Sequence, residues 1–187
     1  MDKNLSSYLK IYNGFLDVKK CRKTVKELEN AVYHKHTYYD VKKDFHKSFS
    51  NDLSITYQNV STIDYLMQRT WDALEQYILK DLNLEWFAGW AGYAQIRFNK
   101  YEVGTEMKNH CDHIHSLFDG MRKGIPILTI LGILNDNFEG GNLVMFEDEV
   151  LKVKTGDLLV FPSNFLYPHR VDPVTKGTRH SFVSWSW

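Results

Sequence analysis

The sequence predicts a mainly β fold with supporting α helices, of the sandwich or open-barrel type, such as a jelly roll. After residue 91, short β-branched or aromatic segments alternate with turn residues. Helical spacing of apolar residues is confined to the first half. The 187 residues are 43% hydrophobic and contain no linker or repeat. We therefore expect a single domain over 1–187, with helical support over roughly 1–90 and a barrel over roughly 91–187.

Two helices are predicted in the first half. Asp17 can cap a helix through VKKCRKTVKELENAV, and Ser61-Thr62, followed by Asp64, can open a second helix. An apolar stripe from Ile63 to Ile78 follows the helical period of that second segment. VYHKHTYYD, between them, looks like a strand. The helices would pack on the outer face of the barrel.

The second half contains seven predicted strands, separated by turn residues such as Asn135-Asp136 and Gly140-Gly141. In chain order, the strands are GYAQIRFNKY, IPILTILGILN, GNLVMF, VLKVK, DLLVF, LYPHRVD and RHSFVSWSW.

Charge and composition narrow the possible partners. Lys plus Arg equals Asp plus Glu at 23 each, so neither nucleic acid nor an anionic membrane surface is expected as a partner. The start lacks a signal-peptide pattern, and no run approaches the roughly 20 apolar residues of a membrane span. Cys21 and Cys111 do not suggest a disulfide framework. We expect a cytoplasmic protein, and nothing predicts its oligomeric state.

His110-Cys111-Asp112 is a candidate metal-binding motif. Residues at i and i+2 of a strand point to the same face. His169, on a distant strand, would complete a two-His, one-carboxylate set that leaves one side of an iron ion open. As alternatives, His169 could be a core histidine, and His113 or His115 could compete as ligands or line the substrate entrance.

Arg179 is a candidate anion-binding residue. Strand alternation puts it on the same face as Ser181, Val183, Trp185 and Trp187. An arginine on an inward face is costly unless it meets an anion, and its planar fork matches a carboxylate. The alternative is a salt bridge to an internal Asp or Glu.

Two other groups are expected to be structural. His34, His36 and His46 lie in a polar, lysine-rich segment, which indicates exposed side chains. Trp86, Phe87 and Trp90 are expected in the core.

The order of motifs resembles that of the Fe(II)/2-oxoglutarate dioxygenases of the prolyl 4-hydroxylase-like group, over roughly residues 91–187. The residues that carry the resemblance are Tyr101-x-x-Gly104, His110-x-Asp112, Leu134-Asn135-Asp136, Phe138-Glu139-Gly140-Gly141, Gly156-Asp157, Phe161-Pro162-Ser163, His169, Val174 and Gly177-x-Arg179.

The resemblance implies a double-stranded β-helix (jelly-roll, cupin-like) fold that binds Fe(II) through His110, Asp112 and His169. It implies that Arg179 binds the distal carboxylate of 2-oxoglutarate, that Tyr101 lies at the cosubstrate pocket, and that Trp185 lies near its floor. The implied reaction uses O2 to hydroxylate a C–H bond of prolyl residues in a peptide or protein, releasing succinate and CO2. Ascorbate is a candidate reductant.

One departure concerns the cosubstrate pocket. Many members carry a tyrosine just before Leu-Asn that helps to hold 2-oxoglutarate, whereas this chain has Ile133. Thr129, or Tyr101 alone, is the expected replacement. His115 and Tyr38 are candidate substrate-binding residues near the mouth.

Three alternatives stay open. The same chemistry could act on a free amino acid or another protein side chain. The jelly roll could be a non-catalytic binding module, with both histidines in the core. A zinc hydrolase is the third, because a His-Asp-His set also binds zinc.

Overall fold

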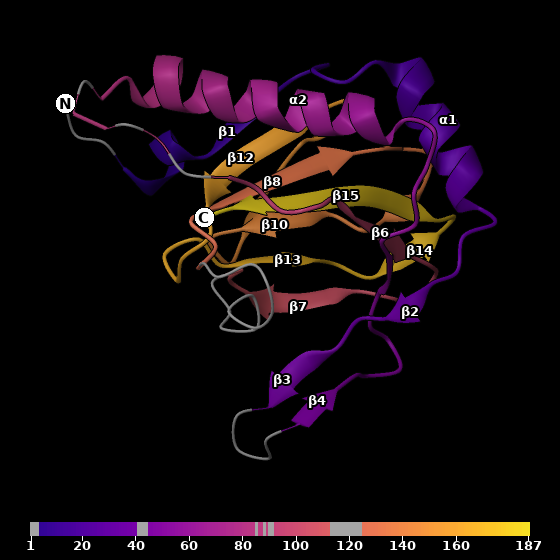
Figure 1. Cartoon of the computed structure of the whole chain (residues 1–187). Coiled ribbons are helices and arrows are strands. Elements are labelled where there is room, and N and C mark those ends of the chain that lie inside the picture. Colours follow the sequence, from indigo (N-terminus) through magenta and orange to yellow (C-terminus); the bar gives the residue numbers. More distant parts are fainter. Residues whose placement is uncertain (1–3, 41–44, 85, 88, 90–91, 113–124) are drawn as a thin grey trace.

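The computed structural model describes residues 4–40, 45–84, 86–87, 89, 92–112 and 125–187, with the backbone alone for 38–40 and 45–46. Two antiparallel sheets face each other across the barrel (Figure 1). The larger sheet has the order β1 (Lys10–Tyr12), β12 (Leu158–Pro162), β8 (Leu128–Ile133), β15 (Arg179–Ser186), β6 (Arg97–Tyr101), β5 (Ser54–Thr56) and β2 (His34–Lys35).

The smaller sheet forms the other wall, in the order β11 (Glu149–Val150), β10 (Leu143–Met145), β13 (His169–Val171) and β7 (Met107–His110). Two further pairs are β14 (Val174–Lys176) with β9 (Glu139–Gly140), and β3 (Tyr38–Asp40) with β4 (Phe45–Lys47). The predicted jelly roll with supporting helices is confirmed.

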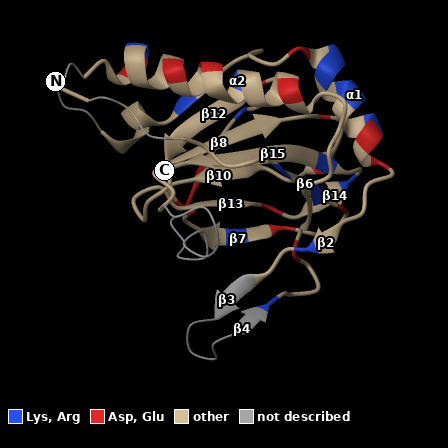
Figure 2. Cartoon of the chain, in the orientation of Figure 1, with Lys and Arg blue, Asp and Glu red and all other residues tan. Residues whose placement is uncertain are grey.

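The helices lie against the outer face of the larger sheet, as predicted (Figure 1). They are α1 (Val18–Leu28) and α2 (Ile63–Gln76), with a 3-10 turn, η1 (Leu5–Tyr8), before β1 and a π-helical turn, η2 (Tyr77–Leu82), after α2. Figure 2 shows acidic and basic residues interspersed over α1 and α2. Among the described residues, no helix combines the length and apolarity needed to cross a bilayer.

Local contacts explain where the helices begin and end. The Asp17 carboxylate accepts the Lys20 N–H at 2.9 Å and caps α1 as predicted. α1 ends at the fully buried Leu28, sooner than the predicted segment, because Ala31 N–H closes a turn onto Leu28. The hydroxyls of Thr24 and Thr62 meet at 2.6 Å and join the two helices.

Alternation along the strands divides the core into two layers. Phe98, Ile130 and Phe182 pack under the helices, whereas Leu131 and Val183 face the interior between the sheets. Because neighbouring side chains of a strand point to opposite faces, the residues in step with Leu131 and Val183 line the barrel interior. That interior contains the candidate site.

Candidate metal centre

His110, Asp112 and His169 converge at one end of the barrel interior. β7 and β13 are antiparallel neighbours, and their register places His169 opposite His110, with ring centroids 4.3 Å apart. Asp112 follows β7, with Oδ1 3.3 Å from His110 Nε2 and Oδ2 3.7 Å from His169 Nε2. One potential ligand atom from each residue lies within 4.8 Å of the other two. The three predicted ligands therefore come together.

Backbone carbonyls orient both imidazoles. His110 Nδ1 lies 2.7 Å from the Lys108 carbonyl oxygen, and His169 Nδ1 lies 3.2 Å from that of Tyr167. A carbonyl can only accept, so each Nδ1 carries the proton and each Nε2 keeps its lone pair. Both lone pairs belong to the nitrogens that lie near Asp112, as metal ligation requires.

The carboxylate is held in its charged form. Burial would raise the pKa of Asp112, but His169, His110 and a hydrogen bond from Thr129 together hold it below the usual range. The Thr129 hydroxyl donates to Asp112 Oδ2 at 2.8 Å and also meets the Ser163 hydroxyl at 2.8 Å. Burial lowers the pKa of His169 to about 4, although Asp112 opposes the shift. The set thus offers an ionised carboxylate, a neutral His169 imidazole and an oriented His110 nitrogen, as metal binding requires.

Arg179 lies in the same interior, at the start of β15. Its side chain is 1% exposed, and its Nη1 donates to Ser181 Oγ at 3.1 Å. Nη2 has no hydrogen-bond partner, and no carboxylate of the described residues forms an ion pair with Arg179. Burial lowers its pKa, while the adjacent Tyr101, whose ring centre is 5.0 Å from Cζ, raises it. The alternative of an internal salt bridge therefore has no partner in the described chain.

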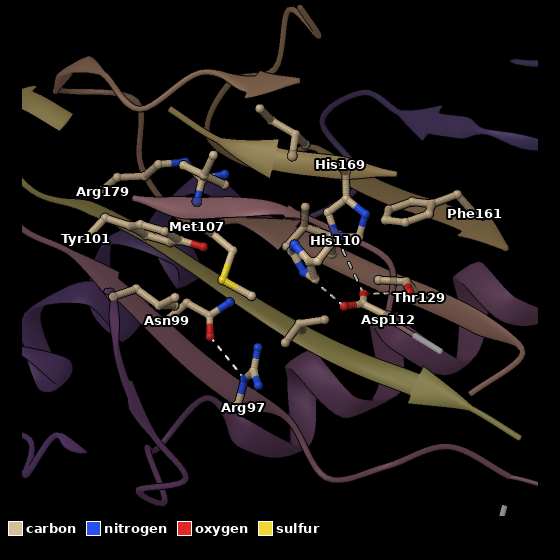
Figure 3. Close-up of a pocket in the computed structure, with 15 residues that line it drawn as sticks. Arg97, Asn99, Tyr101, Met107, His110, Asp112, Thr129, Phe161, His169 and Arg179 are labelled. Carbon is tan, nitrogen blue, oxygen red and sulfur yellow. Dashed lines mark hydrogen bonds and ion pairs between the residues drawn. The ribbon is translucent and has the colours of Figure 1, made fainter. Parts of the chain in front are cut away.

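A single pocket joins the ligand triad to Arg179 (Figure 3). Tyr101 and Thr129 line it, as predicted, and the Thr129 hydroxyl already bonds Asp112. Trp185 is 5% exposed and does not itself line the pocket. Its ring centre lies 4.8 Å from Cζ of Arg97, which does line it. The fifteen lining residues are Leu53, Arg97, Asn99, Tyr101, Met107, His110, Asp112, Thr129, Leu131, Leu143, Phe161, His169, Val171, Arg179 and Val183.

Two expectations about exposure are wrong. His36 is buried at 9% exposure because its backbone N–H bonds Leu53 across the barrel edge; burial and then the charge of Arg97 lower its pKa to about 3. Trp86 is 79% exposed and not part of the core. His34 is exposed as expected.

Several expectations fall where the structure gives no side chain. His113, His115 and Trp90 lie outside the described residues, as do the side chains of Tyr38 and His46.

Three further lining residues were not predicted from the sequence: Arg97, Asn99 and Met107. A sequence signal for Arg97 and Asn99 was available, because alternation along RFNKY places both on the same strand face as Tyr101.

Residues 96–187 match the family model described as "2OG-Fe(II) oxygenase superfamily". The match covers 92 of the 187 residues, and the fold and the ligand triad described above agree with it. The curated relatives it resembles include PKHD-type hydroxylases from Methylobacterium nodulans (38% identity over 95 residues, 48% of this chain and 41% of the relative) and Aliarcobacter butzleri (40% over 97 residues, 48% and 41%). The matches thus span about two fifths of the length of these relatives.

Solved structures share the oxygenase fold over almost the whole chain. A prolyl hydroxylase from Trichoplax adhaerens, in complex with a hypoxia inducible factor peptide fragment, has a TM-score of 0.71 at 20% identity and covers 97% of this chain and 84% of that one. A viral collagen prolyl hydroxylase from Paramecium Bursaria Chlorella virus-1 has a TM-score of 0.65 at 17% identity, covering 96% and 94%. These likenesses extend the fold to the helical half.

The donor set suits the metal of this superfamily. Two imidazole nitrogens and one carboxylate on one side of a site, with the remaining side open, are the usual protein ligands of non-haem Fe(II). The Nδ1 contacts to carbonyls and the Thr129 bond to Asp112 are the supporting contacts that such ligands require.

Proposed function

We propose that this chain catalyses the Fe(II)- and 2-oxoglutarate-dependent hydroxylation of a C–H bond. The observation that carries the proposal is the buried guanidinium of Arg179, which has no carboxylate partner among the described residues and lies in the same pocket as a metal-ligand triad. A buried cation without an anion is destabilising, and a carboxylate that enters with the cosubstrate would remove that cost. A binding module with histidines in its core gives no reason for this arrangement.

The pocket residues would act by binding and orientation. His110, Asp112 and His169 would hold Fe(II), and Arg179, with Tyr101 beside it, would hold the far carboxylate of 2-oxoglutarate. When bound, iron and 2-oxoglutarate supply the oxidative decarboxylation, with O2, that yields succinate, CO2 and the hydroxylated product. Fixing the keto acid at both ends lowers the entropic cost of reaction.

The apolar wall would exclude water from the reacting groups. Leu131, Leu143, Phe161 and Val171 line the same pocket as the triad. Ile133, where a tyrosine is common in the family, is buried in the same apolar layer. Tyr101 is the nearest candidate to replace that tyrosine, because Thr129 already donates to Asp112.

A prolyl residue of a peptide or protein is the proposed substrate. Its support is the fold shared with solved prolyl hydroxylases, one of them in complex with a peptide fragment. The same chemistry on a free amino acid is the alternative. We propose ascorbate as the reductant that sustains repeated turnover.

Mass spectrometry tests the proposed reaction. The protein would be incubated with Fe(II), 2-oxoglutarate, ascorbate, and either proline-rich peptides or free amino acids. We expect the gain of one oxygen on proline together with succinate, and neither product with Asp112→Ala. Oxygen on a free amino acid would move the assignment to the alternative. Absence of succinate and of hydroxylated product in every mixture would contradict the proposal.

A further inference from the structure

A second arginine, Arg97, lines the pocket away from Arg179 (Figure 3). It begins β6, where Arg97, Asn99 and Tyr101 share the inward face, and the β15 register pairs Tyr101 with Arg179 and Arg97 with Val183. Arg97 and Tyr101 lie four residue steps apart along β6, or about 13 Å. Arg97 therefore lies at the end of this row that is away from Tyr101 and from Arg179, the β15 neighbour of Tyr101.

Two contacts hold the Arg97 side chain. Its Nε donates to Asn99 Oδ1 at 3.1 Å, and its Cζ lies 4.8 Å from the ring centre of Trp185. Arg97 is half-buried, and within the described chain no carboxylate forms an ion pair with it. These contacts engage the Nε and the face of the guanidinium, which leaves its terminal nitrogens for another partner.

The charges of the loaded pocket leave Arg97 unmatched. Among the lining side chains, Arg97 and Arg179 are cationic and Asp112 is anionic. A bound Fe(II) would be neutralised by Asp112 and the near carboxylate of 2-oxoglutarate, and Arg179 by the far carboxylate. One positive charge then remains, on Arg97.

We propose that Arg97 binds a carboxylate of the substrate, so that the molecule hydroxylated here carries an acidic group close to the reacting carbon. The inference rests on the proposed function and narrows its substrate class. A planar guanidinium partly shielded from water by Trp185 matches a carboxylate through two parallel hydrogen bonds, whereas a neutral amide offers one acceptor oxygen. The carboxylate can be the α-carboxylate of a free or C-terminal amino acid, or the acidic side chain of a peptide.

Paired substrates that differ only in this charge test the inference. One pair is N-acetyl-L-proline and its amide; the other is an internal proline-containing peptide with Glu beside the proline and the same peptide with Gln. With the wild-type protein, we expect the acidic member of one pair to be hydroxylated with a kcat/KM about 10- to 100-fold above that of the neutral member. The pair that shows this preference identifies the source of the carboxylate.

Variants at Arg97 separate binding from a structural role. Arg97→Met keeps an apolar stem on Trp185 and should abolish the preference by lowering kcat/KM on the acidic member alone, mainly through KM. Arg97→Lys should restore part of it. Lys100→Met, which removes a cation from the same strand but the opposite face, is the matched control and should keep the full preference.

The visible absorption band of the anaerobic Fe(II)–2-oxoglutarate complex distinguishes the two ways to fail. If the band forms but neutral members react as well as acidic ones, or Arg97→Met weakens both equally, or no acidic probe is hydroxylated, the inference is overturned and the proposed function is not. If the band does not form, the proposed function fails and the inference with it.

Discussion

Replacement of Arg179 with Met should have opposite effects on cosubstrate binding and on the stability of the unliganded protein. The side chain is 1% exposed, and its Nη2 has no partner. A hydrogen bond to a charged group contributes about 1.5–3 kcal/mol, and Nη1 is already shared with Ser181. One to two such bonds to a carboxylate amount to about 2–4 kcal/mol. Because 1.4 kcal/mol corresponds to a tenfold change, affinity for 2-oxoglutarate should fall roughly 30- to 700-fold.

The same change removes a buried charge that lacks an anion, so the unliganded variant should be at least as stable as the wild type. Replacement of a buried ion pair by apolar side chains is often neutral or stabilising by about 1–4 kcal/mol, and a buried charge without its partner is less favourable than a pair. For a chain of this size, each kcal/mol corresponds to about 2–4 °C in Tm.

Thermal unfolding with Fe(II) under anaerobic conditions, across a 2-oxoglutarate titration, measures both effects. Arg179→Lys is the control, since it keeps the charge but loses the planar fork, and should bind with intermediate affinity. A clearly lower Tm of unliganded Arg179→Met with unchanged 2-oxoglutarate affinity would refute the reasoning, because it would make Arg179 a structural residue.

Three further predictions concern the surroundings of the pocket. Thr129→Val removes the hydrogen bond to Asp112, so metal affinity in a titration should fall about 10-fold. Thr129→Ser keeps the hydroxyl and should keep the wild-type affinity. Equal affinity of the Val and Ser variants would count against this role. Burial and nearby cations lower the pKa of His180 to about 4. Between about pH 4 and 6.5, this residue is therefore neutral in the folded protein but binds a proton in the unfolded chain. Stability should therefore fall between pH 6.5 and 4, by about 3 kcal/mol from this residue, and urea unfolding of His180→Gln should show a shallower dependence; an unchanged slope would contradict the assignment. Gly132→Ala would place a Cβ 2.1 Å from the Phe182 ring and should cost about 1–3 kcal/mol in urea unfolding, recovered in part by Phe182→Leu, whereas an undiminished stability would contradict the packing.

Local patterns in the sequence were enough to predict His110, Asp112 and Arg179 as candidate site residues. The i, i+2 spacing of His110 and Asp112, and the alternation that turns Arg179 inward, follow from strand geometry alone. The pairing that sets His169 opposite His110 joins strands far apart in the chain, and only the order of motifs pointed to it.

The features that were missed depend on contacts across the fold. His36 has polar neighbours in sequence but is buried because its segment pairs with the chain at Leu53. β1 is a three-residue strand that pairs with β12, and three residues are too few for a local period to mark it. Trp86 was expected in the core because it belongs to a cluster of aromatic residues in the sequence, yet it lies at the surface after η2.

The Fe(II)–2-oxoglutarate complex, formed without oxygen, tests the central claim most directly. We expect a visible charge-transfer band when Fe(II) and 2-oxoglutarate are added to the wild-type protein, and its loss in Asp112→Ala, which removes the only carboxylate of the triad. A wild-type protein that shows no band at saturating concentrations, or an Asp112→Ala variant that keeps it, would contradict the assignment of His110, Asp112 and His169 as the iron ligands.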